Sequence, residues 1–396
     1  MINIISNRFY SGRSSPLFTA SKAREVYDFH KIIPGYEPTP LIPLEALAHR
    51  LGVKSILVKD ESKRFGLNAF KVLGGSYALG KLLAARLNVS LSEVNFRTIA
   101  TRLPEPLTFI TATAGNHGTG VAWAAREMGQ KAVVYMPSGA AKSSVERIKN
   151  LGAECIVTDV NYDDTVRLAS RTAEENGWEL VQDTAWEGYE QIPTWISQGY
   201  MTMAAEAHEQ FNSAGQSPTH IFLQAGVGAM AGGVLGYYSD ALGPSAFKSV
   251  ICEPQAADCL YRSASSEAGE RVNVNGALDS IMTGLACGEV NPVTWDILRD
   301  CGCYFASVSD EISATGMRVA GNPLKNDDRI ISGESGAIGL GLLYQIMSLN
   351  KPAMSELRHE LGLNSNSVVL IFSTEGDTNP QRYRDIVWYG KYSTNK

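Results

Sequence analysis

Residues 107–136 read LTFITATAGNHGTGVAWAAREMGQKAVVYM, and this stretch decides the fold class. It opens with a run rich in β-branched residues (107–113), passes through a glycine-containing turn into a helical segment (115–129), and returns to a second apolar run (131–136). A strand, a helix and a strand in such close succession predict two parallel strands joined by a crossover helix. Because the alternation recurs from residue 55 to residue 373, we expect an α/β fold with open, mostly parallel twisted sheets flanked by helices.

The same alternation indicates two domains. Four strand–helix units between residues 88 and 206 predict a small inserted α/β domain, and residues 1–87 with 207–396 predict a large domain. The polar, proline-containing stretch 97–106 is a candidate linker. The expected strands are 55–59, 107–113, 131–136, 155–158, 180–182, 220–224, 249–253, 304–308 and 368–373, and the expected helices include 69–86, 115–129, 141–152, 163–176 and 193–211.

Composition and charge argue against several classes of protein. The 396 residues are 44% hydrophobic and 19% charged, which is typical of globular proteins. The net charge of −6 disfavours a nucleic-acid partner, because no basic excess is available to neutralise phosphates. No apolar run reaches the roughly 18 residues that span a bilayer, and the N-terminus lacks the apolar segment of a signal peptide. We therefore expect a cytoplasmic protein with no membrane partner and, given scattered His and Cys, no metal site.

Lys71 is the first candidate for chemistry. It lies in KDESKRFGLNAFKVLGG (59–75), at the start of an expected helix and beside apolar neighbours. Partial desolvation of an amine lowers its pKa and makes it nucleophilic. A solvated surface lysine is the ordinary alternative for such a position.

Three further motifs follow apolar strands. TATAGNHGTG (111–120) and QAGVGAMAGG (224–233) carry glycines before a helix, where free N–H groups bind carboxylate or phosphate. IFSTEGD (371–377) places hydroxyl groups at the carboxyl end of a strand, where α/β sheets bind ligands. Each motif also has a purely structural interpretation, as a capped turn or as close helix–sheet packing.

Together these four motifs resemble fold type II pyridoxal-phosphate enzymes, the tryptophan synthase beta-like family, in which a lysine, GNHG, glycines and hydroxyls occur in this order. Among them the chain is similar to the diaminopropionate ammonia-lyases along nearly its whole length. The strings that carry this resemblance are KDESKRFGLNAFK, NLGAECIVTD, NYDDTVRLA, VQDTAWEGY, IPTW, QAGVGAMAGGVLGY, GLACGE, RIISGESGA and STEGDT.

The resemblance implies a role for each matching residue, with pyridoxal 5'-phosphate as the cofactor of the large domain. Lys71 would be the Schiff-base lysine, and Asp183 the acidic group near the β-substituent of the substrate. Asn116 would bind the ring hydroxyl oxygen of the cofactor. The other implied positions are Gly226, Val227, Gly228, Ala229 and Met230 for the phosphate, Ser373 and Thr374 for the pyridine nitrogen, and Thr113, Ala114, Gly115 and His117 for the substrate.

The chain departs from the expected family pattern TDGNHGRG at two positions. It has Ala114 in place of the Asp and Thr119 in place of the Arg. The family Asp is the base that removes the α-proton of the D-isomer, on the face opposite the lysine, and alanine has no acid–base group. The departure implies an L-selective enzyme, a different leaving group, or an engineered variant.

The implied function is elimination of 2,3-diaminopropionate to pyruvate and ammonia, by a homodimeric lyase of amino-acid catabolism. The alternatives are a deaminase similar to serine or threonine dehydratases, acting on another small β-substituted amino acid, and a cofactor-binding metabolite sensor without turnover. The resemblance also implies that Cys259 and Cys287 lie close together, either as a pair or as two separate buried thiols.

Overall fold

The computed structural model describes residues 1–113 and 115–393. The chain forms two compact units. The large unit comprises residues 1–20, 38–68 and 203–396, and the small unit comprises residues 21–37 and 69–202.

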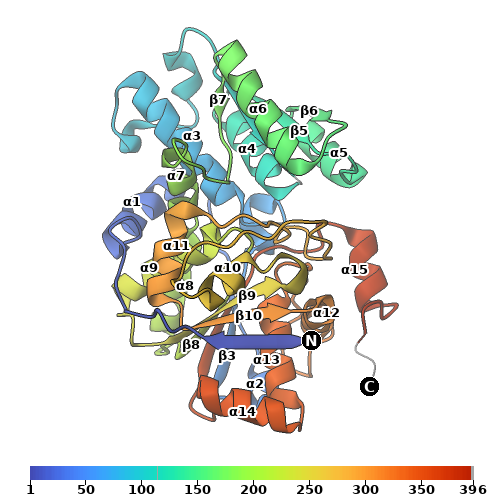
Figure 1. The fold of residues 1–396 in the computed structure, drawn as a ribbon. Coiled ribbons are helices and arrows are strands. Elements are labelled where there is room, and N and C mark those ends of the chain that lie inside the picture. The colour runs from blue at the N-terminus through green and yellow to red at the C-terminus, as the bar shows by residue number, and fades with distance from the viewer. Residues whose placement is uncertain (114, 394–396) are drawn as a thin grey trace. The chain divides into compact units, whose positions relative to one another are not determined.

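A seven-stranded sheet forms the centre of the large unit, in the order β1-β10-β9-β8-β11-β3-β2. Figure 1 labels its strands β3, β8, β9 and β10. The strands are β1 (Ile2–Ser6), β2 (Leu41–Pro43), β3 (Ser55–Asp60), β8 (His220–Gln224), β9 (Lys248–Pro254), β10 (Tyr304–Val308) and β11 (Val368–Ser373). The five inner strands are parallel, whereas β1 and β2 pair antiparallel at the two edges. Every residue of β3, β8, β10 and β11 is buried, so both faces of the sheet are covered.

Helices of the large unit complete this core. They are α2 (Glu45–Leu51), α9 (Ala229–Ala241), α10 (Cys259–Ser265), α11 (Pro292–Cys301), α12 (Asp310–Gly321), α13 (Ile338–Ser348), α14 (Pro352–Leu361) and α15 (Pro380–Val387), with short 3-10 turns η1 (Glu61–Gly66) and η4 (Gln255–Ala257). Alternate residues of β9 and β10, such as Cys252 and Ala306, enter one apolar cluster with side chains of α2, α12 and α13. This alternation follows from the period of two along a strand.

The small unit contains a four-stranded parallel sheet in the order β6-β5-β4-β7. Its strands are β4 (Thr108–Ala112), β5 (Lys131–Met136), β6 (Glu154–Val157) and β7 (Glu179–Leu180). Its helices are α1 (Ala20–Lys31), α3 (Val72–Leu87), α4 (Asn116–Glu127), α5 (Lys142–Asn150), α6 (Tyr162–Asn176) and α7 (Gln191–Gly199), with turns η2 (Leu91–Glu93) and η3 (Ile99–Arg102). Helix α8 (Met201–Ser213) begins in the small unit and continues into the large one.

Glycines allow α3 to contact both α4 and α7 in the small unit. A Cβ on Gly120 of α4 would lie 2.8 Å from the backbone nitrogen of Val72, and one on Gly199 of α7 would lie 2.5 Å from the Leu73 carbonyl oxygen. A side chain at either position would therefore separate the helices. Because Lys71 directly precedes α3, these contacts fix where its backbone lies.

A cluster of four buried charges stabilises the turn after β3 in the large unit. Arg64 donates to both carboxylate oxygens of Glu206, at 2.7 and 2.8 Å, and also to Glu61 at 2.9 Å. The Lys59 ammonium lies 2.7 Å from Glu206 and donates to the Thr39 carbonyl oxygen. All four charged side chains are at most 1% exposed, and two positive charges balance two negative ones. Burial opposes the charge of Glu206, but attraction to Arg64 and Lys59 lowers its pKa to about 2.

We expect Glu206→Gln to lower the free energy of unfolding by about 3–5 kcal/mol at pH 7, because it leaves two buried cations with one carboxylate. The pKa of Glu206 is lower in the folded chain than its ordinary value of 4.5, so its stabilisation is complete above that pH and is lost as the pH falls toward 2. Urea unfolding should therefore show the two proteins converging as the pH falls below 4.5. Glu209→Gln, at an exposed position of the same helix, is the matched control and should change stability by less than about 0.5 kcal/mol. An equal loss in both variants would contradict a special role for the cluster.

The α/β class and both sheets agree with the sequence prediction, with three local differences. The edge strands β1 and β2 were not predicted, because short edge strands carry a weak apolar pattern. The helix expected over 193–211 is instead two helices, α7 and α8, which meet at Tyr200. Gly199, the last residue of α7, lies in close contact with α3.

The compact units differ in their bounds from the predicted domains, 1–87 with 207–396 and 88–206. Residues 21–37 and 69–87 group with the small unit, because α3 packs on α4 and α7 and because a Cβ on Gly80 of α3 would lie 2.5 Å from the Phe29 ring of α1. The predicted division into functional domains stays a prediction. Among the helices within the described ranges, none combines the length and the apolar character needed to cross a membrane.

Candidate active site

Lys71 is the residue on which the small-unit site is centred. It occupies the N-cap position of α3, and its side chain is 21% exposed. Its Nζ donates to Asp183 Oδ2 at 2.7 Å, and lies 5.7 and 6.0 Å from the ring centroids of Phe70 and Tyr200. The lysine is thus a partly desolvated amine with a carboxylate partner, and not a solvated surface charge.

The loop after β7 holds Asp183 in place. The Gln182 backbone N–H donates to the Tyr189 hydroxyl at 2.8 Å, and that hydroxyl donates to the Leu180 carbonyl oxygen at 2.9 Å. The Gln182 side-chain oxygen accepts from the Ala112 N–H at 3.0 Å, which ties the loop to β4. Burial by itself would raise the pKa of Asp183, but attraction to His117 and Lys71 lowers it to about 2. The carboxylate is therefore charged across the physiological pH range.

His117, in the first turn of α4, is the third member of this group. Its side chain is 3% exposed, and its Nε2 lies 2.8 Å from the Val181 carbonyl oxygen. Its Nδ1 lies 3.8 Å from Asp183 Oδ2 and has no hydrogen-bond partner among the described residues. Burial is the main cause that lowers the pKa of His117, and the Lys71 charge adds to it against the attraction of Asp183.

Thr113 has a structural role in the turn before α4. Its hydroxyl oxygen accepts from the N–H groups of Gly115 and Gly118, at 3.0 and 3.3 Å, and so caps the helix. The Asn116 side-chain oxygen lies 3.5 Å from Arg147 Nη2. Ala114 lies outside the described residues.

The glycine-rich turn of the large unit joins β8 to α9. Gly228 caps the helix with φ of 101°, and a Cβ there would lie 2.7 Å from Leu298 Cδ1. A Cβ on Gly226 would lie 3.2 Å from the Leu285 backbone. Leu298 and Leu285 therefore leave room only for glycine at these two positions, and the N–H groups from Gly226 to Met230 lie at a helix N-terminus, as an anion site needs.

Buried hydroxyl groups follow β11 in the same unit. Gln224 Nε2 donates to the Thr374 hydroxyl at 2.8 Å and to the Phe372 carbonyl oxygen at 2.8 Å. The Ser373 hydroxyl lies 2.8 Å from that of Ser332. Because the Thr374 oxygen accepts from Gln224, its own proton is available for another acceptor.

Cys259 and Cys287 lie close together, as expected. The Cys259 sulfur lies 3.8 Å from the Cys287 carbonyl oxygen, and burial raises the pKa of the Cys259 thiol. A raised pKa disfavours the reactive thiolate.

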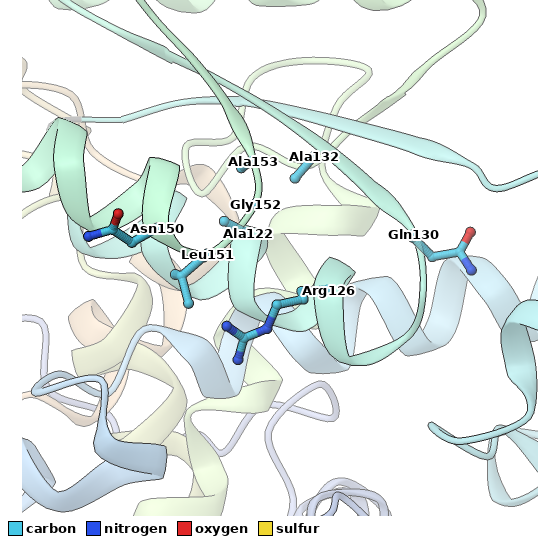
Figure 2. Close-up of a pocket in the computed structure, with 8 residues that line it drawn as sticks. All are labelled: Ala122, Arg126, Gln130, Ala132, Asn150, Leu151, Gly152 and Ala153. Atoms are coloured by element: carbon cyan, nitrogen blue, oxygen red, sulfur yellow. The ribbon is translucent and has the colours of Figure 1, made fainter.

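A pocket of about 240 Å³ opens elsewhere in the small unit (Figure 2). It is lined by Ala122, Arg126, Gln130, Ala132, Asn150, Leu151, Gly152 and Ala153, and none of the predicted site residues is among them. Its volume is below the roughly 300–1,000 Å³ of typical ligand pockets. We therefore do not assign it as the active site.

The small unit brings three of the predicted residues together, Lys71, Asp183 and His117. The prediction missed the residues that hold them, Gln182, Tyr189 and Val181, and it missed Gln224 beside Thr374. Gln182 ends the strand that was predicted over 180–182, and Gln224 ends β8; these positions were the available signal. A tyrosine seven residues downstream of its backbone partner leaves no pattern in the sequence.

Comparisons with known proteins agree with this geometry. Residues 32–372 match the family described as "Pyridoxal-phosphate dependent enzyme". The chain is 56% identical to the diaminopropionate ammonia-lyase of Escherichia coli K12, over 99% of this chain and 98% of that protein, and 49% identical to that of Salmonella typhimurium, over 98% and 97%. The crystal structure of the Escherichia coli enzyme in complex with D-serine superposes with a TM-score of 0.94 at 55% identity, covering 99% of this chain and 98% of that one.

We expect Tyr189→Phe to lower the free energy of unfolding by about 1–2 kcal/mol, because it leaves the buried Gln182 N–H without an acceptor. Urea unfolding at pH 7 measures the change. Tyr389→Phe is the matched control, since that side chain is 73% exposed, and it should have no measurable effect. A stability equal to that of the unchanged protein would show that the hydroxyl does not hold the Asp183 loop.

Proposed function

Because this chain belongs to the family of pyridoxal-phosphate-dependent enzymes, we propose that it is an ammonia-lyase that converts 2,3-diaminopropionate to pyruvate and ammonia. The observation that carries this proposal is the Lys71–Asp183 pair, which joins an amine nucleophile to a buried carboxylate. The similarity to curated ammonia-lyases over nearly the full chain supports it.

The residues present fit the cofactor, which supplies an electron sink for the negative charge that develops at the α-carbon of the substrate. We assign Lys71 as the lysine that binds it covalently, and the N–H groups from Gly226 to Met230 as its phosphate site. The fit rests on the glycine turn before α9, which has no room for a Cβ at Gly226 or Gly228, and on the Thr374 hydroxyl, whose proton can be donated to a ring nitrogen. Asn116 and Ser373 complete the proposed set.

The chain's own residues then move protons. Lys71 removes the α-proton of the substrate, because its amine is held at the start of a fixed helix. Asp183 orients the β-amino group, which leaves readily only in its protonated form. Thr113 and Gly115 shape the turn at the start of α4, and we place the carboxylate of the substrate at this helix N-terminus.

One experiment separates the candidate functions. The purified protein is incubated with D- and L-2,3-diaminopropionate, L-serine and L-threonine, and the keto-acid product is measured. Turnover of L-diaminopropionate above that of the two hydroxyl substrates supports the ammonia-lyase. Faster turnover of L-serine or L-threonine favours a dehydratase-like deaminase, a possibility raised by the small residue before Gly115. Bound cofactor without any turnover would indicate a sensor.

Lys71→Ala should lower turnover by roughly 10³-fold or more, because it removes both the covalent partner of the cofactor and the base. Borohydride reduction of the unchanged protein, followed by peptide mapping, should label Lys71. Lys81→Ala, on the same helix, is the control and should retain activity. Labelling of any other lysine would overturn the assignment.

We also propose that the enzyme is L-selective. Lys71 approaches the substrate from one face, and Ala114 provides no base at the other. Ala114→Asp should raise turnover of the D-isomer by about 10²–10⁴-fold and change that of the L-isomer by less than about tenfold. Ala141→Asp, an exposed site at the start of α5, is the matched control. Equal turnover of both isomers by the unchanged protein would contradict L-selectivity.

A homodimer and a cytoplasmic location remain predictions from the sequence.

A further inference from the structure

His117 Nδ1 and Asp183 Oδ2 are two buried acceptors that face each other. They lie 3.8 Å apart, on side chains that are 3% and 13% exposed. We propose that they form the recognition site for the β-ammonium group of the substrate, and that His117 selects an ammonium over a hydroxyl at that position. The inference rests on the proposed function and names a specificity-determining residue within it.

The tautomer of His117 follows from its other nitrogen. A backbone carbonyl can only accept, so the bond of 2.8 Å to Val181 requires the proton on Nε2. Burial, the adjacent Lys71 ammonium and the positive end of the α4 dipole oppose a second proton on the ring, and together they outweigh the attraction of Asp183, so that the pKa of His117 is lowered. Nδ1 therefore presents a lone pair, and no donor among the described residues satisfies it.

Lys71 shows what kind of group fits beside the two acceptors. Its ammonium donates to Asp183 Oδ2 at 2.7 Å, and the Gln182 side-chain nitrogen Nε2 lies 3.5 Å from Asp183 Oδ1. When the Lys71 nitrogen is bonded to the cofactor, it can no longer supply a full ammonium to the carboxylate. A different cation is then needed to balance a buried negative charge.

The number of donors distinguishes the possible substrates. An ammonium has three N–H donors, so one group can satisfy both Asp183 Oδ2 and His117 Nδ1. A hydroxyl has one donor and leaves one of the two acceptors unpaired. An unpaired buried acceptor weakens binding by roughly 10–100-fold. The site therefore favours a β-amino over a β-hydroxy amino acid.

Two substitutions distinguish the acceptor role of His117 Nδ1 from the structural hydrogen bond that Nε2 donates to Val181. His117→Gln places an amide near the Nε2 position, where it can still donate to Val181, but replaces Nδ1 by a methylene group. His117→Asn places an amide oxygen near Nδ1 and loses the bond to Val181. The measurement is the ratio of kcat/KM for L-diaminopropionate to that for L-serine, with an inhibition constant for L-serine if it is not turned over.

We expect His117→Gln to lower this ratio roughly 10–100-fold, mainly through a higher KM for diaminopropionate. His117→Asn should keep the ratio within about threefold of the unchanged enzyme, even where its stability or overall rate falls. Equal shifts in both variants would show a merely structural role, and an unchanged ratio in both would overturn the proposal. If the unchanged enzyme turns over neither compound, the proposed function itself fails.

A spectroscopic measurement tests the tautomer without activity. Two-bond ¹H–¹⁵N spectra of ¹⁵N-histidine-labelled protein distinguish the two neutral tautomers and the charged ring, and His117→Gln assigns the signal. We expect His117 to be neutral at pH 7 with its proton on Nε2. A charged ring, or a proton on Nδ1, would make the nitrogen a donor and overturn the proposal.

Discussion

The contact between the backbones of α3 and α4 is the constraint on which the small-unit site depends. A Cβ on Gly120 would lie 2.8 Å from Val72 and 3.0 Å from the carbonyl carbon of Lys71, so the two helices touch without intervening side chains. Lys71 begins one helix and His117 lies in the first turn of the other. Their separation is therefore set by backbone packing, which is the stiffest support that a protein interior provides for two side chains.

Much of the fold could be predicted because its strands are fully buried. The strands 220–224, 304–308 and 368–373 have the predicted bounds, since continuous apolar runs between polar turns leave little ambiguity. The interruption at Tyr200 was not predicted, because the pattern that predicts one helix over 193–211 continues across it. The grouping of residues 21–37 with the small unit depends on tertiary packing.

The candidate site was predictable in its residue types and not in its bonds. A lysine among apolar residues, glycines before helices and an acidic residue after a strand are signals that a sequence carries. Lys71 Nζ and Asp183 Oδ2 lie 2.7 Å apart, although the two residues are 112 positions apart in the sequence. This contact depends on the loop that Gln182 and Tyr189 hold in place. The role of Thr113 as a helix cap was also beyond prediction, because a hydroxyl beside glycines suits a ligand and a cap equally well.

The charge cluster around Arg64 and the one around Asp183 differ in whether their charges are balanced within the protein. Around Arg64 every charge has a partner within hydrogen-bonding distance, and the side chains are at most 1% exposed, so the cluster has no need of a ligand. Within the described residues, the cation that pairs with Asp183 is the Lys71 amine, which is also the amine that the proposed function uses, and the neighbouring His117 Nδ1 has no hydrogen-bond partner there. The Lys71 amine can neutralise the charge of the Asp183 carboxylate only while it is a free ammonium group. In the proposed function that amine binds the cofactor, and the β-ammonium group of the substrate then balances the carboxylate, which favours a cationic substrate.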